Sequence, residues 1–215
     1  KFIKEREIAV AIVTNGSRMH KIQEIADSLD EKDWVRLSLD SGCDATFQLM
    51  HKPKKKISLE EICTGVSNIK TNSTKFKIGY SFIVTWKGAV INDRNIVENI
   101  NEIPDATFLA KKHKFDYISV KPFLERSVSN NAEIIGIDDE TKNYLEVIKR
   151  IRVSIRKAKE LEDENFSVIE STNLKALEKG LYKDYTIQPK NCHFTYFRQV
   201  LSPLGLFNCP VYRHV

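Results

Sequence analysis

Apolar residues along the first 170 positions switch repeatedly between the spacing of a strand and the spacing of a helix. An unbroken apolar run at 8–13 ends at Thr14-Asn15-Gly16, which is typical of a strand buried on both faces and followed by a turn. Period-two alternation then marks three further strands, at 34–40, 76–84 and 117–121. Helical stripes separate these strands: one contains Ile22, Ile25 and Leu29, one follows a capping-box pattern at Ser58 and Glu61, and one begins near Pro104.

Strands that alternate with helices predict a parallel sheet in an α/β protein. The faces of the predicted strands favour one architecture within this class. On three of them the side opposite the large apolar residues is small or polar: Ser38 and Asp40, Gly79 and Ser81, Ser119 and Lys121. A sheet covered on both faces would be apolar on both. The pattern therefore predicts a partial (open) parallel β/α barrel with a polar lumen, and the alternative is that register and edge effects place these residues.

The regular alternation ends after Pro122. A charged helical pattern covers 142–160, one more strand is expected at 166–170, and the aromatic-rich end of the chain has Ser202-Pro-Leu-Gly205 as a hairpin turn. We therefore expect two parts: barrel segments over residues 1–160, and a small irregular C-terminal extension over residues 161–215.

Composition and charge bear on the cellular location of the protein and on its classes of partner. Of the 215 residues 41% are hydrophobic, yet no apolar run approaches the roughly 20 residues of a spanning helix, and no leader pattern opens the chain. These features predict a cytoplasmic protein without a membrane partner. The formal net charge is +5, but the basic residues are dispersed apart from Lys52–Lys56, so no nucleic-acid partner is expected.

Ligands of α/β barrels bind where the strands end. Hydroxyl and carboxylate groups there suit the ribose and amino-acid portions of a cofactor, although each serine is equally explained as a small lumen residue and Asp40 as part of an Asp-Ser-Gly turn. The predicted mouth contains Asn15, Asp40, Thr85 and Lys121, with Ser38, Ser81 and Ser119 deeper.

Several strings, taken in order, resemble radical S-adenosylmethionine enzymes. They are Val13-Thr-Asn-Gly16, Arg36-Leu-Ser-Leu-Asp-Ser-Gly42, His51-Lys52-Pro53, Ile78-Gly-Tyr-Ser-Phe-Ile-Val84, Ile103-Pro104, Leu109-Ala110-Lys111, Phe115-Asp116-Tyr117-Ile118 and Lys121-Pro122. Over about 120 residues they look like the third to sixth strands of that family's six-stranded partial barrel.

The resemblance implies reductive cleavage of S-adenosylmethionine at a [4Fe–4S] cluster, which yields a radical that abstracts a substrate hydrogen. It implies cofactor contacts at Asn15, Ser38, Asp40, Ser81 and Lys121. It also implies a peptide or small-molecule substrate and an electron donor such as ferredoxin or flavodoxin. The family's CxxxCxxC loop and Gly-Gly-Glu turn do not occur. We expect them upstream of Lys1, so that this chain alone would be inactive.

Cys192 and Cys209 enclose the predicted hairpin. This arrangement resembles the start of the SPASM or twitch extension, which holds auxiliary [4Fe–4S] clusters and implies a metal site at these two thiolates. Two thiolates do not close such a site, so two packed or free thiols are the alternative.

Two other functions remain open from the sequence. One is a barrel aldolase or isomerase that uses Lys121, which ends a strand, as its reactive lysine. The other is a non-catalytic module that binds a peptide or other substrate at a sheet edge.

Overall fold

The computed structural model describes residues 2–71, 74–87, 90–91, 94–126, 133–134, 144–181 and 193–208. Five strands form one sheet in the order β1-β2-β3-β6-β9, and every neighbouring pair is parallel. The strands are β1 (Ala11–Thr14), β2 (Trp34–Ser38), β3 (Lys77–Val84), β6 (Tyr117–Pro122) and β9 (Ser167–Glu170). The α/β class predicted from the sequence is confirmed, while closure toward a barrel stays a prediction.

Helices connect the strands. The longer ones are α1 (Met19–Ile25), α2 (Asp44–His51), α3 (Leu59–Ile69), α4 (Ile103–Lys112) and α5 (Tyr144–Lys159), and α6 (Thr172–Glu178) follows β9. Short 3-10 turns cover Lys4–Arg6, Ala26–Ser28 and Ile100–Glu102. No helix among the described ranges has both the length and the apolar composition that crossing a bilayer requires.

Small two-stranded ribbons complete the described part: β4 (Val90–Ile91) with β5 (Arg94–Asn95), β7 (Glu125–Arg126) with β8 (Glu133–Ile134), and β10 (Val200–Ser202) with β11 (Gly205–Phe207). The last ribbon follows the four-residue helix α7 (Phe194–Phe197). It confirms the predicted hairpin, with Gly205 at a φ of 137° where the chain reverses.

Local sequence explains where two of the helices begin. Ser58 accepts the Glu61 N–H at 3.1 Å and the Glu61 carboxylate accepts the Ser58 N–H at 2.6 Å, so the predicted capping box forms and starts α3. Proline lies in the first turn of α4, where its missing N–H costs no hydrogen bond.

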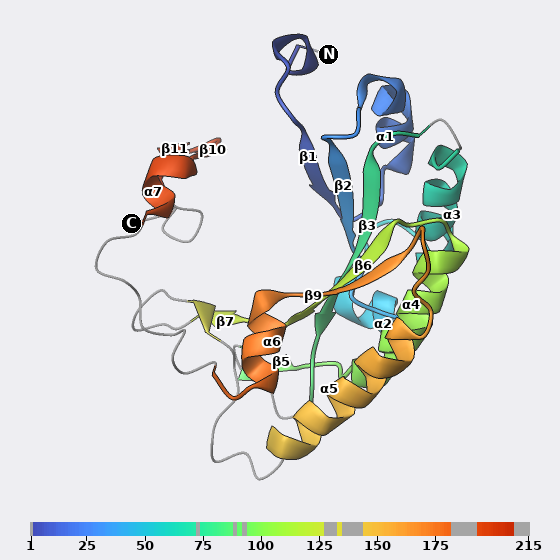
Figure 1. Cartoon of the computed structure of the whole chain (residues 1–215), viewed down its shortest axis with the longest axis vertical. Coiled ribbons are helices and arrows are strands. Elements are labelled where there is room, and N and C mark those ends of the chain that lie inside the picture. Colours follow the sequence, from blue (N-terminus) through green and yellow to red (C-terminus); the bar gives the residue numbers. More distant parts are fainter. Residues whose placement is uncertain are drawn as a thin grey trace.

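Helices α1, α3, α4 and α5 all lie along the same face of the sheet (Figure 1). The apolar side chains of the strands point into this layer and are fully buried, as are those of the facing helices. Each fully buried aliphatic or aromatic side chain contributes about 1.5–3 kcal/mol to folding. The strand residues of this core are Val35, Leu37, Ile78, Tyr80, Phe82, Val84, Ile118, Val120 and Val168.

The first and last strands differ from expectation. The predicted strand at 8–13 begins only at Ala11, because pairing with β2 starts there, and Val13 is 56% exposed rather than buried. At the other edge, β9 pairs with β6 after the predicted domain boundary near residue 160. The sheet therefore continues to Glu170, while the division of the chain into two domains stays a prediction.

The amino end of β2 depends on one buried carboxylate. Asp33 is 1% exposed, accepts the N–H groups of Val10 and Asp30 at 2.7 Å each, and lies 2.9 Å from the Lys4 ammonium. Burial acts to raise the pKa of Asp33, but these hydrogen bonds outweigh it and hold the pKa below its usual value. The group thereby joins the start of the chain to the sheet.

We expect Asp33→Asn to lower the free energy of unfolding by about 2 kcal/mol at neutral pH, because an amide offers fewer acceptors to the three donors. A depressed carboxyl pKa stabilises the fold above the unfolded pKa, and this stability disappears as the pH falls through the folded pKa. Urea titrations should therefore show the gap between wild type and variant closing in acid. Exposed Glu31→Gln is the matched control, and a constant gap at all pH values would contradict this account.

Candidate functional site

The face of the sheet opposite the helix layer is polar, and register places its side chains in rows. Arg36, Gly79 and Tyr117 pair across β2, β3 and β6, and the next row contains Ser38, Ser81 and Ser119. Ile83 and Lys121 lie in the third row. We call this surface the open face. It contains three of the sequence-predicted contacts, Ser38, Ser81 and Lys121, and Asp40 follows the end of β2.

Arg36 contributes a positive charge to the first row of the open face. Its guanidinium carbon is 5.2 Å from the centroid of the Trp34 ring, a cation–π distance. Its Nε atom is buried, and it is the one buried side-chain nitrogen or oxygen within the described ranges that has no hydrogen-bond partner. Leaving such a group unsatisfied costs about 1–3 kcal/mol. Arg36 as a whole is half-buried, so its exposed part rather than the buried Nε is open to an acceptor.

Lys121 faces the same surface. Burial, followed by the positive charge of Arg36, lowers the pKa of Lys121, and Asp40 opposes this by raising it. Within the part of the chain that the structure describes, neither Arg36 nor Lys121 has a carboxylate oxygen within ion-pair distance. Two neighbouring cations without a carboxylate partner attract an anion.

The ring of Tyr117 lies over Gly79, its neighbour in the first row. A Cβ placed on Gly79 would lie 2.1 Å from the Tyr117 ring, so the absent side chain at Gly79 is what lets the ring lie flat on the strand. Burial raises the pKa of the Tyr117 phenol, with Arg36 acting in the opposite direction. The phenol is thus held neutral beside the guanidinium and can donate a hydrogen bond.

The three serines of the middle row have no hydrogen-bond partner among the described residues. Ser81 and Ser119 are nearly buried, at 4% and 7% exposure. Small hydroxyls at this depth provide donors and acceptors between the two cations.

Asp40 has mainly a structural role. Its φ is 51°, and its carboxylate accepts the Ile83 N–H at 2.8 Å and lies 3.5 Å from His51 Nε2. Burial raises its pKa. Asn99, 1% exposed, donates to the carbonyls of Asp40 and Ile83 at 2.8 and 2.9 Å and accepts the Thr85 N–H at 2.8 Å. Together these bonds hold the carboxyl ends of β2 and β3 in place.

The remaining predicted residues do not join the open face. Asn15 is exposed and accepts the Ser17 N–H at 3.1 Å within its own turn. Thr85 donates its hydroxyl to the Val97 carbonyl. Cys192 and Cys209 lie outside the described residues.

No described cluster of three or more His, Cys, Asp or Glu residues is arranged to hold a metal. Of the other cysteines, Cys43 is exposed, and Cys63 is buried in α3, where burial raises the pKa of its thiol to about 12. Such a thiol is protonated at neutral pH and packs as a small apolar side chain.

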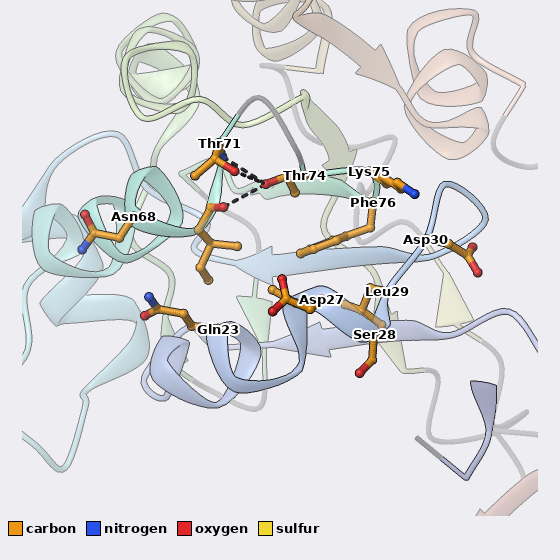
Figure 2. A pocket seen from close by; sticks show the side chains of 12 residues that line it. Gln23, Asp27, Ser28, Leu29, Asp30, Asn68, Thr71, Thr74, Lys75 and Phe76 are labelled. Atoms are coloured by element: carbon orange, nitrogen blue, oxygen red, sulfur yellow. Dashed lines mark hydrogen bonds between the residues drawn. The ribbon is translucent and has the colours of Figure 1, made fainter. Parts of the chain in front are cut away.

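A cavity of about 640 Å³ lies at the opposite, amino end of the sheet (Figure 2). It is lined by the end of α1 and the following turn on one side, and on the other by Asn68, Ile69, Thr71, Thr74, Lys75 and Phe76. The Thr74 hydroxyl donates to the Ile69 carbonyl at 2.9 Å and accepts the Thr71 N–H at 3.0 Å, which closes the loop at its rim. None of the sequence-predicted site residues reaches it.

One further cluster has the composition of a catalytic triad. The Ser67 hydroxyl is 2.9 Å from His113 Nδ1, and His113 Nε2 is 3.0 Å from a Glu60 oxygen. Ser67 lies inside α3, whose amide groups are engaged in the helix, so no pair of N–H groups is available to stabilise an oxyanion. We assign this cluster the structural role of joining α3 to the end of α4.

Comparison with known proteins gives one named similarity. The chain is 26% identical over 151 residues to a protein described as GTPase Obg from Brachyspira hyodysenteriae, and the match covers 69% of this chain and 21% of that protein. The chain thus spans about a fifth of the length of the curated relative it matches. No protein-family model and no solved structure matches the chain.

This similarity overturns the radical S-adenosylmethionine assignment, including the S-adenosylmethionine and [4Fe–4S] cofactors, because the relative is named a GTPase and no family model supports the resemblance. The physical reason is that short strings such as Ile78-Gly-Tyr-Ser are what any parallel strand with one apolar and one polar face requires. Their order along the chain follows from the repeated strand–helix unit rather than from a shared reaction.

Sequence reasoning missed the two residues that most define the open face. Strand alternation placed Arg36 on the same side as Ser38, yet Arg36 was not predicted to bind a ligand, because nothing local showed that it lacks an acidic partner. The contact of Tyr117 with Gly79 depends on register between two strands. Only the pairing of β3 with β6 reveals it.

We expect Asn99→Ala to lower the free energy of unfolding by about 2–3 kcal/mol, because it removes two donors and one acceptor from buried backbone groups. Chemical denaturation measures this change. Asn68→Ala, at an exposed position on α3, is the control and should leave stability within about 0.5 kcal/mol. Equal effects of the two variants would show that Asn99 does not hold the strand ends.

Proposed function

We propose that the open face binds a nucleoside phosphate, with Arg36 and Lys121 contacting the phosphate oxygens. The observation that carries this proposal is that two cations, Arg36 and Lys121, share the polar open face and that neither has a carboxylate within ion-pair distance in the described ranges. Guanidinium groups bind phosphate through paired N–H donors, and an ammonium adds a point charge. Charge and geometry thus both favour a phosphorylated ligand.

The rest of the open face suits the remainder of such a molecule. The Ser38, Ser81 and Ser119 hydroxyls offer hydrogen bonds to phosphate or ribose oxygens. Trp34 and Tyr117 supply aromatic surface at the edge of the site, and base–aromatic stacking contributes about 1–3 kcal/mol per base. A small ligand is proposed, whereas the sequence left a peptide and a small molecule open as substrates.

The named similarity supports the nucleotide class, because the relative is described as a GTPase. It also supports a hydrolase as the enzyme class. The chain contains no G-x-x-x-x-G-K-[ST] sequence, so the proposed phosphate contacts come from strand side chains and not from a glycine-rich loop. For this reason GTP, GDP and ATP are compared with inorganic phosphate in the binding test.

Isothermal titration calorimetry of the purified chain with these four compounds tests the proposal. We expect the nucleotides to bind and Arg36→Gln to weaken their affinity roughly 10- to 100-fold, which corresponds to about 1.5–3 kcal/mol for charge-assisted hydrogen bonds. Lys21→Gln removes an exposed lysine of α1 and should leave the affinity unchanged. Phosphate release, followed in the same samples, measures hydrolysis.

Two results would contradict the proposal. One is the absence of heat with all four compounds. The other is an Arg36→Gln affinity equal to that of wild type, since binding would then take place elsewhere on the chain.

The affinity for phosphate ligands should fall as the pH rises from neutral into the alkaline range. Lys121 loses its proton at a lower pH than an ordinary lysine because its pKa is lowered, and only the protonated ammonium attracts phosphate. Binding should therefore raise the pKa of Lys121 and take up protons at alkaline pH. Calorimetry in two buffers of different ionisation enthalpy measures this uptake, and Lys121→Met should abolish it. Uptake that persists in the variant would exclude Lys121 as its source.

A further inference from the structure

Helix α5 has a basic outer face on the side of the molecule away from the open face. Its sequence contains six lysines and arginines and one acidic residue, Glu146. Its apolar residues Val147, Ile148, Ile151, Ile155 and Ala158 are buried against the core. The helix is therefore already anchored in the fold, and its charge is directed to solvent.

Only part of this charge is neutralised. Arg150 pairs with Glu98 and Lys159 with Glu170, while Arg152 donates to the Glu178 carbonyl. Lys149, Arg156 and Lys157 have no carboxylate partner among the described residues. An exposed helix usually balances its charges by pairs three or four residues apart, and α5 does not.

Two grooves lie along this helix. One, of about 380 Å³, lies between α5 and residues 178–180, and the other, of about 230 Å³, lies between α5 and residues 101–104. Lys149 and Val153 line both grooves, so they form the ridge between them. Leu145 is 78% exposed at the end of the first groove, and Val153 is 37% exposed.

We propose that this face of α5 binds an acidic segment of a partner protein that carries aliphatic side chains between its carboxylates. The cations at Lys149, Arg156 and Lys157 match carboxylates, and the grooves beside Val153 accommodate aliphatic groups. Aliphatic rather than aromatic residues lie between the cations, which disfavours nucleic acid. A membrane surface is disfavoured because the apolar face of α5 is already buried in the core.

The probe is a fluorescently labelled synthetic peptide in which Glu and Leu repeat with the spacing of one helical face. Anisotropy titration of the full chain should give saturable binding. The double variant Lys149→Glu/Arg156→Glu should weaken it by about fivefold or more. The matched control, Lys21→Glu/Lys32→Glu, changes the net charge equally at exposed positions away from α5 and should bind as wild type does.

Three competitors test which class of partner the face of α5 binds. They are an oligoglutamate without leucine, a single-stranded RNA, and vesicles of phosphatidylcholine and phosphatidylserine in equal parts. Each should bind more weakly than the Glu–Leu peptide, and hydrogen exchange should show peptide-dependent protection at 144–159. Equal effects of the two double variants would overturn the proposal. Tighter binding of oligoglutamate would also overturn it, because the grooves would then contribute nothing, and tighter binding of the RNA or the vesicles would overturn it because the occupant would not be a protein segment.

Discussion

The helices α1, α3, α4 and α5, which lie between consecutive strands of the main sheet, are all on one face of it, and this single-sidedness is the constraint on which the rest of the structure depends. A parallel pair needs a connection that returns to the same end, and here those connections contain α1, α3, α4 and α5 on the same side (Figure 1). That side buries the large apolar residues. The other side is left to small and polar residues, which gives the molecule one surface suited to packing and one suited to binding.

Side-chain hydrogen bonds secure the ends of the strands, where the ladder alone leaves groups unpaired. Asp33 and Asp116 immediately precede β2 and β6, and each accepts an N–H from a neighbouring segment, from Val10 and Ile78 respectively. Each is also paired with a lysine, Lys4 or Lys70. At the carboxyl ends Asn99 and Asp40 take this role. The open face is therefore held at both ends by buried, multiply bonded groups, which is the rigidity that a binding surface needs.

The two proposed surfaces follow from charges that the fold leaves without partners. On the open face, Arg36 and Lys121 come from β2 and β6, strands far apart in sequence, and share one face because both strands pair with β3. On α5, the unpaired cations are all local, and the fold contributes the grooves beside them. The first surface suits a small phosphorylated molecule and the second an acidic protein segment, so a single variant on each distinguishes the two.

The sequence by itself determined the α/β class, the start of α3 at its capping box, the turn before Gly205 and the polarity of the open face, because each depends on spacing within a few residues. It did not determine the ligand: ordered strand strings suggested a radical enzyme, and the similarity to a GTPase contradicts this. Only the tertiary structure decided that β9 joins the sheet, that Tyr117 lies on Gly79 and that Arg36 Nε lacks a partner. Those facts depend on register and burial, which arise only when distant segments pack together.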